Sequence, residues 1–110
     1  MTPGHFGLTL ETQGNRHTLL LSGELDLASA PELEAEAHRL CGEGAGELVL
    51  DLSELDFMDS TGLRALLTCI HLCEEHGCVF LVTPGRPQVE RLFEVVGARG
   101  ALPFRAKPAG

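Results

Sequence analysis

The residues best suited to chemistry lie in one octapeptide, Asp-Phe-Met-Asp-Ser-Thr-Gly-Leu, at positions 56–63. It follows an apolar run at 48–50 that predicts a buried strand, and it leads into a helical pattern over 63–76. A carboxylate and two hydroxyls therefore stand at a predicted helix start, where a side chain can cap the helix or a phosphate can be held. Spacing alone favours a cap, with either Asp59 or Ser60 as the capping residue.

Two apolar residues and a glycine flank these polar groups. We expect one of Phe57 and Met58 to anchor the loop in the core and the other to be an exposed contact for another protein. Gly62 leaves the first helical turn without a bulky side chain, which predicts that a large group can approach the backbone there.

Phosphorylation is the reaction that would change this site most. It would add about −1.5 to −2 charges at Ser60. A helix N-terminus favours that charge, whereas Asp56 and Asp59 would oppose it. Because these effects roughly offset, we expect phosphorylation to act on a partner packed over the loop rather than on the fold.

Motifs for other chemistry are missing from the sequence. There is no G-x-x-x-x-G-K-[ST] phosphate loop, no G-x-S-x-G elbow and no H-E-x-x-H pair. The glycines at 42, 44 and 46 do not complete a dinucleotide fingerprint, because Glu47 stands where a small residue belongs. No histidine is placed to argue for a catalytic triad with Ser60. We therefore expect neither an enzyme nor a cofactor.

The four cysteines are Cys41, Cys69, Cys73 and Cys78, and none of their spacings is C-x-x-C. Cys69 and Cys73 lie four apart with His76 close behind, a set that could hold a metal. The same positions fall in an apolar helical stripe, however. We expect buried, small apolar residues with free thiols, and no metal.

The first half of the chain predicts a hairpin and a helix. Alternation over 6–12 and an apolar run over 17–22 predict two strands, joined by a turn at Gly14-Asn15. A helix should begin at Ser29 or Ala30, with Pro31 in its first turn and Ser29-x-x-Glu32 as a capping box. Its apolar stripe is Leu33, Ala37, Leu40 and Cys41, and the glycine-rich segment 42–46 ends it.

The second half alternates strands and helices. Residues 47–52 predict a strand buried on both faces, and the helix after the octapeptide should stop at Gly77. Residues 78–82 predict a strand and 88–96 a helix, with an optional edge strand at 102–104. The tail 105–110 should be flexible. The apolar stripes of the two helices are Leu63, Leu66, Leu67, Ile70 and Cys73, and then Val89, Leu92, Phe93 and Val96.

This order, ββαβαβα(β), predicts the fold class. It is α/β: one domain over residues 1–110, with a four- to five-stranded mixed sheet, an N-terminal antiparallel hairpin and three helices.

Charge and composition argue against some classes of binding partner. The formal net charge is −8 and there is no Trp or Tyr, so neither a basic face nor a stacking surface for nucleic acid is expected. No signal peptide or membrane-length apolar segment is seen, so we expect a cytoplasmic protein that does not insert into membranes. An acidic stretch is either a solvated helix face or a docking surface for a basic partner: Glu24, Asp26, Glu32, Glu34 and Glu36.

Three segments together resemble a known family. Residues 57–63 resemble the signature of bacterial anti-sigma factor antagonists, which are small STAS-domain proteins. Gly-Glu-Leu-Asp at 23–26 and Arg-Leu-Phe-Glu-Val-Val-Gly at 91–97 resemble that family's early and late segments. The resemblance covers nearly the whole chain in the same order, which makes it more specific than the Asp-Ser-Thr-Gly sequence alone.

The resemblance implies a partner switch in transcription, of the kind used in stress response or sporulation. The unphosphorylated antagonist would bind an anti-sigma factor that is also an ATP-binding serine kinase of the GHKL type, which releases a sigma factor. The kinase would phosphorylate Ser60, with Thr61 as a secondary site, and a PP2C-type phosphatase would reverse this. An alternative is a non-switching STAS module, in a stressosome or a lipid-transport ABC complex.

The resemblance also implies a partner-binding surface. Arg64 departs from the family, which often has a small residue there, and it either alters that surface or extends into solvent. An exposed sheet edge or a patch at Met58 would support a weak dimer; otherwise we expect a monomer. The expected surface comprises Glu24, Asp26, Met58, Asp59, Thr61, Gly62 and Arg64.

Overall fold

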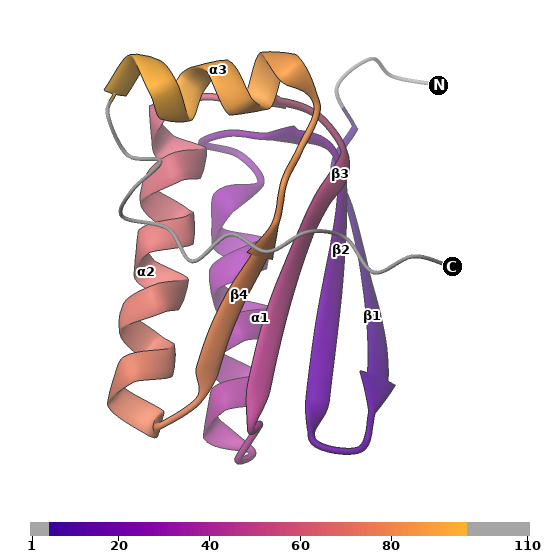
Figure 1. Ribbon diagram of the computed structural model, residues 1–110, viewed down its shortest axis with the longest axis vertical. Helices are drawn as coiled ribbons and strands as arrows, with labels where there is room; N and C mark the ends of the chain where they lie inside the picture. Colours follow the sequence, from indigo (N-terminus) through magenta and orange to yellow (C-terminus); the bar gives the residue numbers. More distant parts are fainter. Residues whose placement is uncertain (1–4, 97–110) are drawn as a thin grey trace.

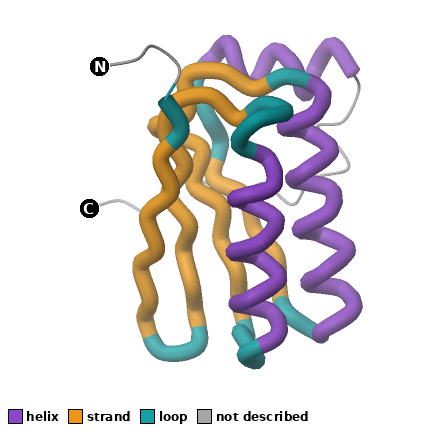
Figure 2. The backbone as a smooth tube through the Cα atoms, turned by 180° about the vertical axis from the view of Figure 1, so that it is seen from behind, coloured by secondary structure: helices purple, strands orange, loops and turns teal. Residues whose placement is uncertain are grey.

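A computed structural model describes residues 5–96 of the chain. The strands form one sheet in the order β1-β2-β3-β4. Helices α1 and α2 cover the same face of the sheet, and α3 lies across one end of it (Figures 1 and 2). The elements in chain order are β1 (Gly7–Gln13), β2 (Arg16–Leu25), α1 (Ala30–Gly42), β3 (Glu47–Met58), α2 (Ser60–His76), β4 (Val79–Thr83) and α3 (Pro87–Val96).

The sheet is mixed, as the sequence predicted. β1 and β2 pair antiparallel through a tight turn in which Gly14 has φ +60°, a conformation that favours glycine. β2, β3 and β4 are parallel to one another. The order ββαβαβα and the α/β fold class are thereby confirmed for the described residues.

β3 is twice as long as expected, because it continues through residues 53–58 to the start of α2. Two shifts in the register with β2 carry the pairing onward to Glu24↔Phe57 and Leu25↔Met58. Strict alternation fails across such irregularities. The first part of the octapeptide is therefore strand rather than loop.

The core follows the predicted apolar stripes with a few differences. The α1 stripe is buried throughout, and Val89 and Phe93 of α3 are fully buried. In α2, Leu67 and Ile70 are only partly buried, because the inward line runs through Ala65, Cys69 and Leu72 instead.

The expected buried face of β1 is wrong in part. Phe6 and Leu8 are half-buried and Leu10 is 37 % exposed. β1 is an edge strand that pairs only with β2. The side chain of Val96, the optional strand at 102–104 and the tail at 105–110 lie outside the described residues. Among residues 5–96, no helix is long and apolar enough to cross a membrane.

All four cysteines are buried and free, as predicted. Burial raises the pKa of the Cys69 thiol to about 12, and it also raises the pKa values of Cys73 and Cys78. These three thiols are therefore neutral near pH 7.

Candidate functional site

The octapeptide lies where the carboxyl ends of β2 and β3 meet the start of α2, near the end of the molecule crossed by α3 (Figure 1). Asp59 has an extended backbone, with φ −105° and ψ −171°, and its Oδ1 accepts a hydrogen bond of 3.0 Å from the Gly62 N–H. Asp59 is thus the N-cap of α2. Ser60 is the first helical residue and is exposed, so its hydroxyl is not used to cap the helix.

Gly62 is buried, and its missing side chain allows close packing in the fold. A Cβ atom there would stand 2.5 Å from the carbonyl oxygen of Leu25 and 2.6 Å from Cγ of Met58. The missing side chain lets the first turn of α2 pack against the ends of β2 and β3. The large group that approaches the backbone at Gly62 is thus the pair of strand ends themselves.

Phe57 and Met58, which are adjacent in β3, point to opposite sides of the strand. Met58 is only 4 % exposed and anchors the segment in the core, whereas Phe57 is 45 % exposed. Met58 cannot present its side chain to a partner or form a dimer patch in this conformation, which corrects that expectation. Leu27, just beyond β2, is a second exposed apolar side chain and is 75 % exposed.

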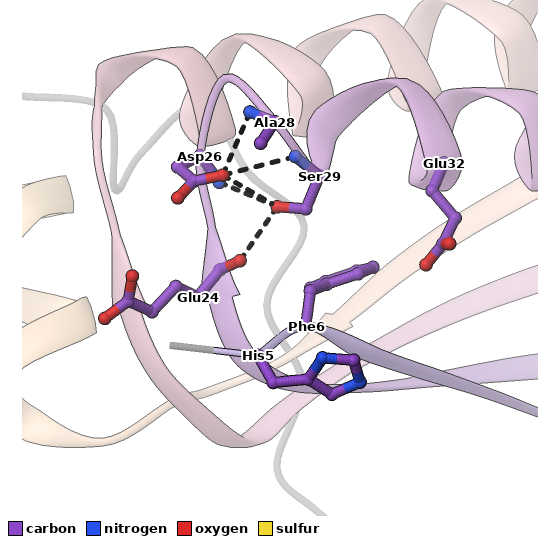
Figure 3. Close-up of a pocket in the computed structure, with 7 residues that line it drawn as sticks. All are labelled: His5, Phe6, Glu24, Asp26, Ala28, Ser29 and Glu32. Atoms are coloured by element: carbon purple, nitrogen blue, oxygen red, sulfur yellow. Dashed lines mark hydrogen bonds between the residues drawn. The ribbon is translucent and has the colours of Figure 1, made fainter. Parts of the chain in front are cut away.

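Asp26 organises the turn between β2 and α1. Its Oδ1 accepts hydrogen bonds from the N–H groups of Ala28 (3.0 Å) and Ser29 (3.2 Å) (Figure 3). The Ser29 hydroxyl accepts from the Asp26 N–H at 3.0 Å and donates to the carbonyl of Glu24 at 2.8 Å. Ser29 is the N-cap by position but makes no side-chain cap hydrogen bond, so the predicted capping box does not form.

Gly23, at the start of the Gly-Glu-Leu-Asp segment, also has a structural role. Its φ is +78°, and a Cβ there would overlap the carbonyl oxygen of His5 at 1.6 Å. Gly23 and Asp26 therefore shape this part of the fold, while Glu24 between them is half-buried. The structure gives Asp26 a local task that the sequence analysis did not foresee.

A hollow of about 270 Å³ opens beside this turn. Glu24, Asp26 and Glu32 line it together with His5 and Phe6, and in Figure 3 the carboxylate of Glu32 is the one on the Phe6 side. Three of its lining residues are acidic and one is a phenylalanine, a composition suited to a basic side chain that has an apolar stem.

Arg86 offsets part of the negative charge of the second half of β3. Its guanidinium pairs with the carboxylate of Asp56, and its Nη2 lies 3.3 Å from Oε2 of Glu54. Gln88 Nε2 donates to the Asp56 carbonyl at 3.1 Å. Sequence reasoning missed Arg86, although the parallel pairing of β3 and β4 brings the turn after β4 to this end of the sheet.

Two further predicted site residues lie on α2. Thr61 is half-buried, and Arg64 is exposed one turn after Ser60. Residues four apart on a helix are neighbours on its surface. Within residues 5–96, Arg64 has no hydrogen-bond or ion-pair partner, and neither a histidine nor a carboxylate side chain hydrogen-bonds the Ser60 hydroxyl.

Comparisons with known proteins match the chain to one family. The STAS domain family model matches residues 8–109. An anti-sigma-B factor antagonist of Staphylococcus aureus (strain NCTC 8325 / PS 47) is 26 % identical over 91 residues, which cover 83 % of this chain and 84 % of that protein.

Solved structures extend the likeness. An anti-sigma factor antagonist from Mycobacterium paratuberculosis superposes with a TM-score of 0.83 at 25 % identity, covering 96 % of this chain and 90 % of that one. The unphosphorylated form of the anti-sigma factor antagonist SpoIIAA superposes with a TM-score of 0.77 at 21 % identity, covering 92 % and 90 %, which supports the fold alone.

Proposed function

The chain belongs to the STAS domain family, and we propose that it is an anti-sigma factor antagonist whose binding is switched off by phosphorylation of Ser60. Relatives across most of its length bear that name. The observation that supports the switch is that the cap of α2 and the exposed hydroxyl come from two different residues. Asp59 caps the helix, which leaves the exposed Ser60 hydroxyl available for modification.

In this proposal, the partner is an anti-sigma factor that is also a GHKL-type serine kinase. It covers the end of the sheet formed by the segments around Ser60 and Asp26. Phe57 and Leu27 supply apolar contacts there, and the recess lined by Glu24, Asp26 and Glu32 receives a basic side chain. Asp59, Thr61 and Arg64 border Ser60.

Phosphorylation would place a dianion beneath this partner. The helix N-terminus favours the charge, and Arg86 already offsets Asp56, so the fold of the antagonist should change little. The partner would have to bury the dianion, and a coupling of roughly 1–3 kcal/mol would lower affinity about 5- to 150-fold. A PP2C-type phosphatase would restore binding. Thr61 is the secondary site in this proposal.

The test uses ATP and the cognate kinase, with phosphate mapped by mass spectrometry. We expect modification mainly at Ser60, only a minor amount at Thr61 in Ser60→Ala, and unchanged modification of Ser60 in Thr61→Ala. Ser60→Asp should weaken binding of the anti-sigma factor, whereas Ser60→Asn, which has the same shape without the charge, should bind more tightly than Ser60→Asp. Equal binding by the Asp and Asn variants, with no phosphate at Ser60, would favour the non-switching module of a stressosome or lipid-transport complex.

A further inference from the structure

Three of the four buried cysteines meet at the end of the molecule opposite Ser60. The Sγ atoms of Cys41, Cys73 and Cys78 all lie within 4.8 Å of one another, and those of Cys41 and Cys73 are 3.7 Å apart. The thiols come from the last turns of α1 and α2 and from the residue before β4. The sequence suggested Cys69, Cys73 and His76 as the metal set to consider, and the fold assembles a different one.

The backbone holds these thiols together. At the end of α2, Gly77 adopts the left-handed conformation with φ +71°, and its N–H bonds to the carbonyl of Glu74. The Cys78 N–H then reaches back to the carbonyl of Cys73 at 2.8 Å. This Schellman motif brings Cys78 beside Cys73. The packing of α1 on α2 adds Cys41 as the third thiol.

We propose that Cys41, Cys73 and Cys78 form a three-thiolate site for a thiophilic trivalent ion of the As(III) type. With sulfurs about 2.3 Å from the ion, the length of zinc–thiolate bonds, the pyramidal geometry of three-coordinate As(III) places them roughly 3.5 Å apart. The longest edge of the cluster therefore needs to contract by roughly 1.3 Å at most. The site lies outside the proposed partner surface and does not depend on the proposed function.

The number of thiolate ligands and the net charge of the complex favour a trivalent ion over zinc and Cu(I). Structural zinc takes four ligands, and no fourth His, Cys, Asp or Glu of residues 5–96 joins this cluster. Three thiolates would leave a zinc complex with one negative charge and a Cu(I) complex with two, and burying net charge is costly. A trivalent ion gives a neutral complex, which suits a buried site beside two helix C-termini.

The binding step balances without an oxidant. Arsenous acid, As(OH)₃, exchanges its three hydroxyl groups for three sulfurs. Three As–O and three S–H bonds break, three As–S bonds form, and three waters leave. Arsenic keeps its oxidation state, and the cysteines are neither oxidised nor reduced.

The test is arsenite uptake by the fully reduced chain, measured by mass spectrometry. We expect one arsenic per chain, with the loss of three hydrogens. Because the sequence holds no Trp or Tyr, the near-ultraviolet absorption of the arsenic–thiolate bonds can be followed without interference. Cys41→Ala, Cys73→Ala and Cys78→Ala should each lower the affinity at least about tenfold.

Cys69→Ala is the matched control. Cys69 is buried on α2, as Cys73 is, but it stands outside the cluster, so its loss should leave arsenite affinity within about twofold. A second measurement uses the unaltered chain in mild urea, where bound arsenite should protect three thiols from alkylation and leave Cys69 reactive. Absence of one-to-one uptake, protection of no thiol, or an equal loss of affinity in Cys69→Ala would overturn the proposal.

Discussion

Asp59 and Ser60 have different roles at the start of α2, although either side chain could have capped the helix. Asp59 supplies the oxygen that caps α2, and Ser60 keeps an exposed hydroxyl in the first turn. From sequence, the two were equal candidates for the cap, because each has a side-chain oxygen suited to it. Only the extended backbone of Asp59 decides between them.

The Asp59 cap should contribute to the stability of the fold. Asp59→Ala should lower the free energy of unfolding by about 1 kcal/mol, since the Gly62 N–H loses its acceptor. Asp59→Asn keeps a side-chain oxygen and should lose much less. Urea unfolding of both variants measures the difference, and equal losses would argue against the cap.

Arg64 makes a prediction about the phosphorylated chain. It lies one turn from Ser60 and has no partner within residues 5–96, so its guanidinium can reach a phosphate at that position. A neighbouring cation favours the dianion, so Arg64→Ala should raise the second pKa of the phosphoserine. Phosphorus NMR titration measures this pKa. Arg91→Ala, which removes an exposed arginine from α3 instead, should leave it unchanged; an equal rise in both variants would exclude a specific pairing.

The strands and helix around the site are held by close packing, which the spacing of residues in the sequence does not predict. Sequence patterns predicted the order of strands and helices, because apolar periodicity and turn residues are local signals. They missed the second half of β3, since its register shifts break the alternation. They did not identify the neighbours of Gly62, because the atoms that need its small size, in Leu25 and Met58, are brought there by tertiary packing.

Gly62→Ala tests this packing. The added Cβ would collide with a backbone oxygen, so α2 must shift, and we expect a loss of about 1–3 kcal/mol in unfolding free energy. Gly42→Ala is the control, because a Cβ there meets no atom within 4 Å; it should be neutral or slightly stabilising. Chemical denaturation of both variants compares them, and a harmless Gly62→Ala would show that this contact does not hold the loop.

At the scale of the whole molecule, the two ends have different chemistry. The end with the carboxyl termini of β2 and β3 carries the exposed Ser60, acidic residues and apolar side chains. The other end holds buried neutral thiols. The sequence predicted burial of Cys41 and Cys73 from the apolar stripes of their helices. The meeting of three of them depends on the packing of α1 on α2, which no local pattern encodes.

The buried thiols make the stability depend on pH. The pKa of Cys69 rises from 9.0 to about 12 on folding, so above pH 9 the unfolded chain releases a proton that the folded chain keeps. Stability should therefore fall as pH rises from about 9 toward 12, by up to about 1.4 kcal/mol per pH unit from this thiol. Cys69→Ala should show a shallower fall. Urea unfolding at several pH values measures both slopes, and identical slopes would contradict the assignment.

The most direct test of the switch is the affinity of one preparation for its cognate anti-sigma factor before and after phosphorylation at Ser60. Isothermal titration calorimetry can measure both values, and circular dichroism can check that the fold is retained. We predict that phosphorylation weakens binding about 5- to 150-fold and leaves the fold unchanged. Equal affinity of the two forms would contradict the proposed switch.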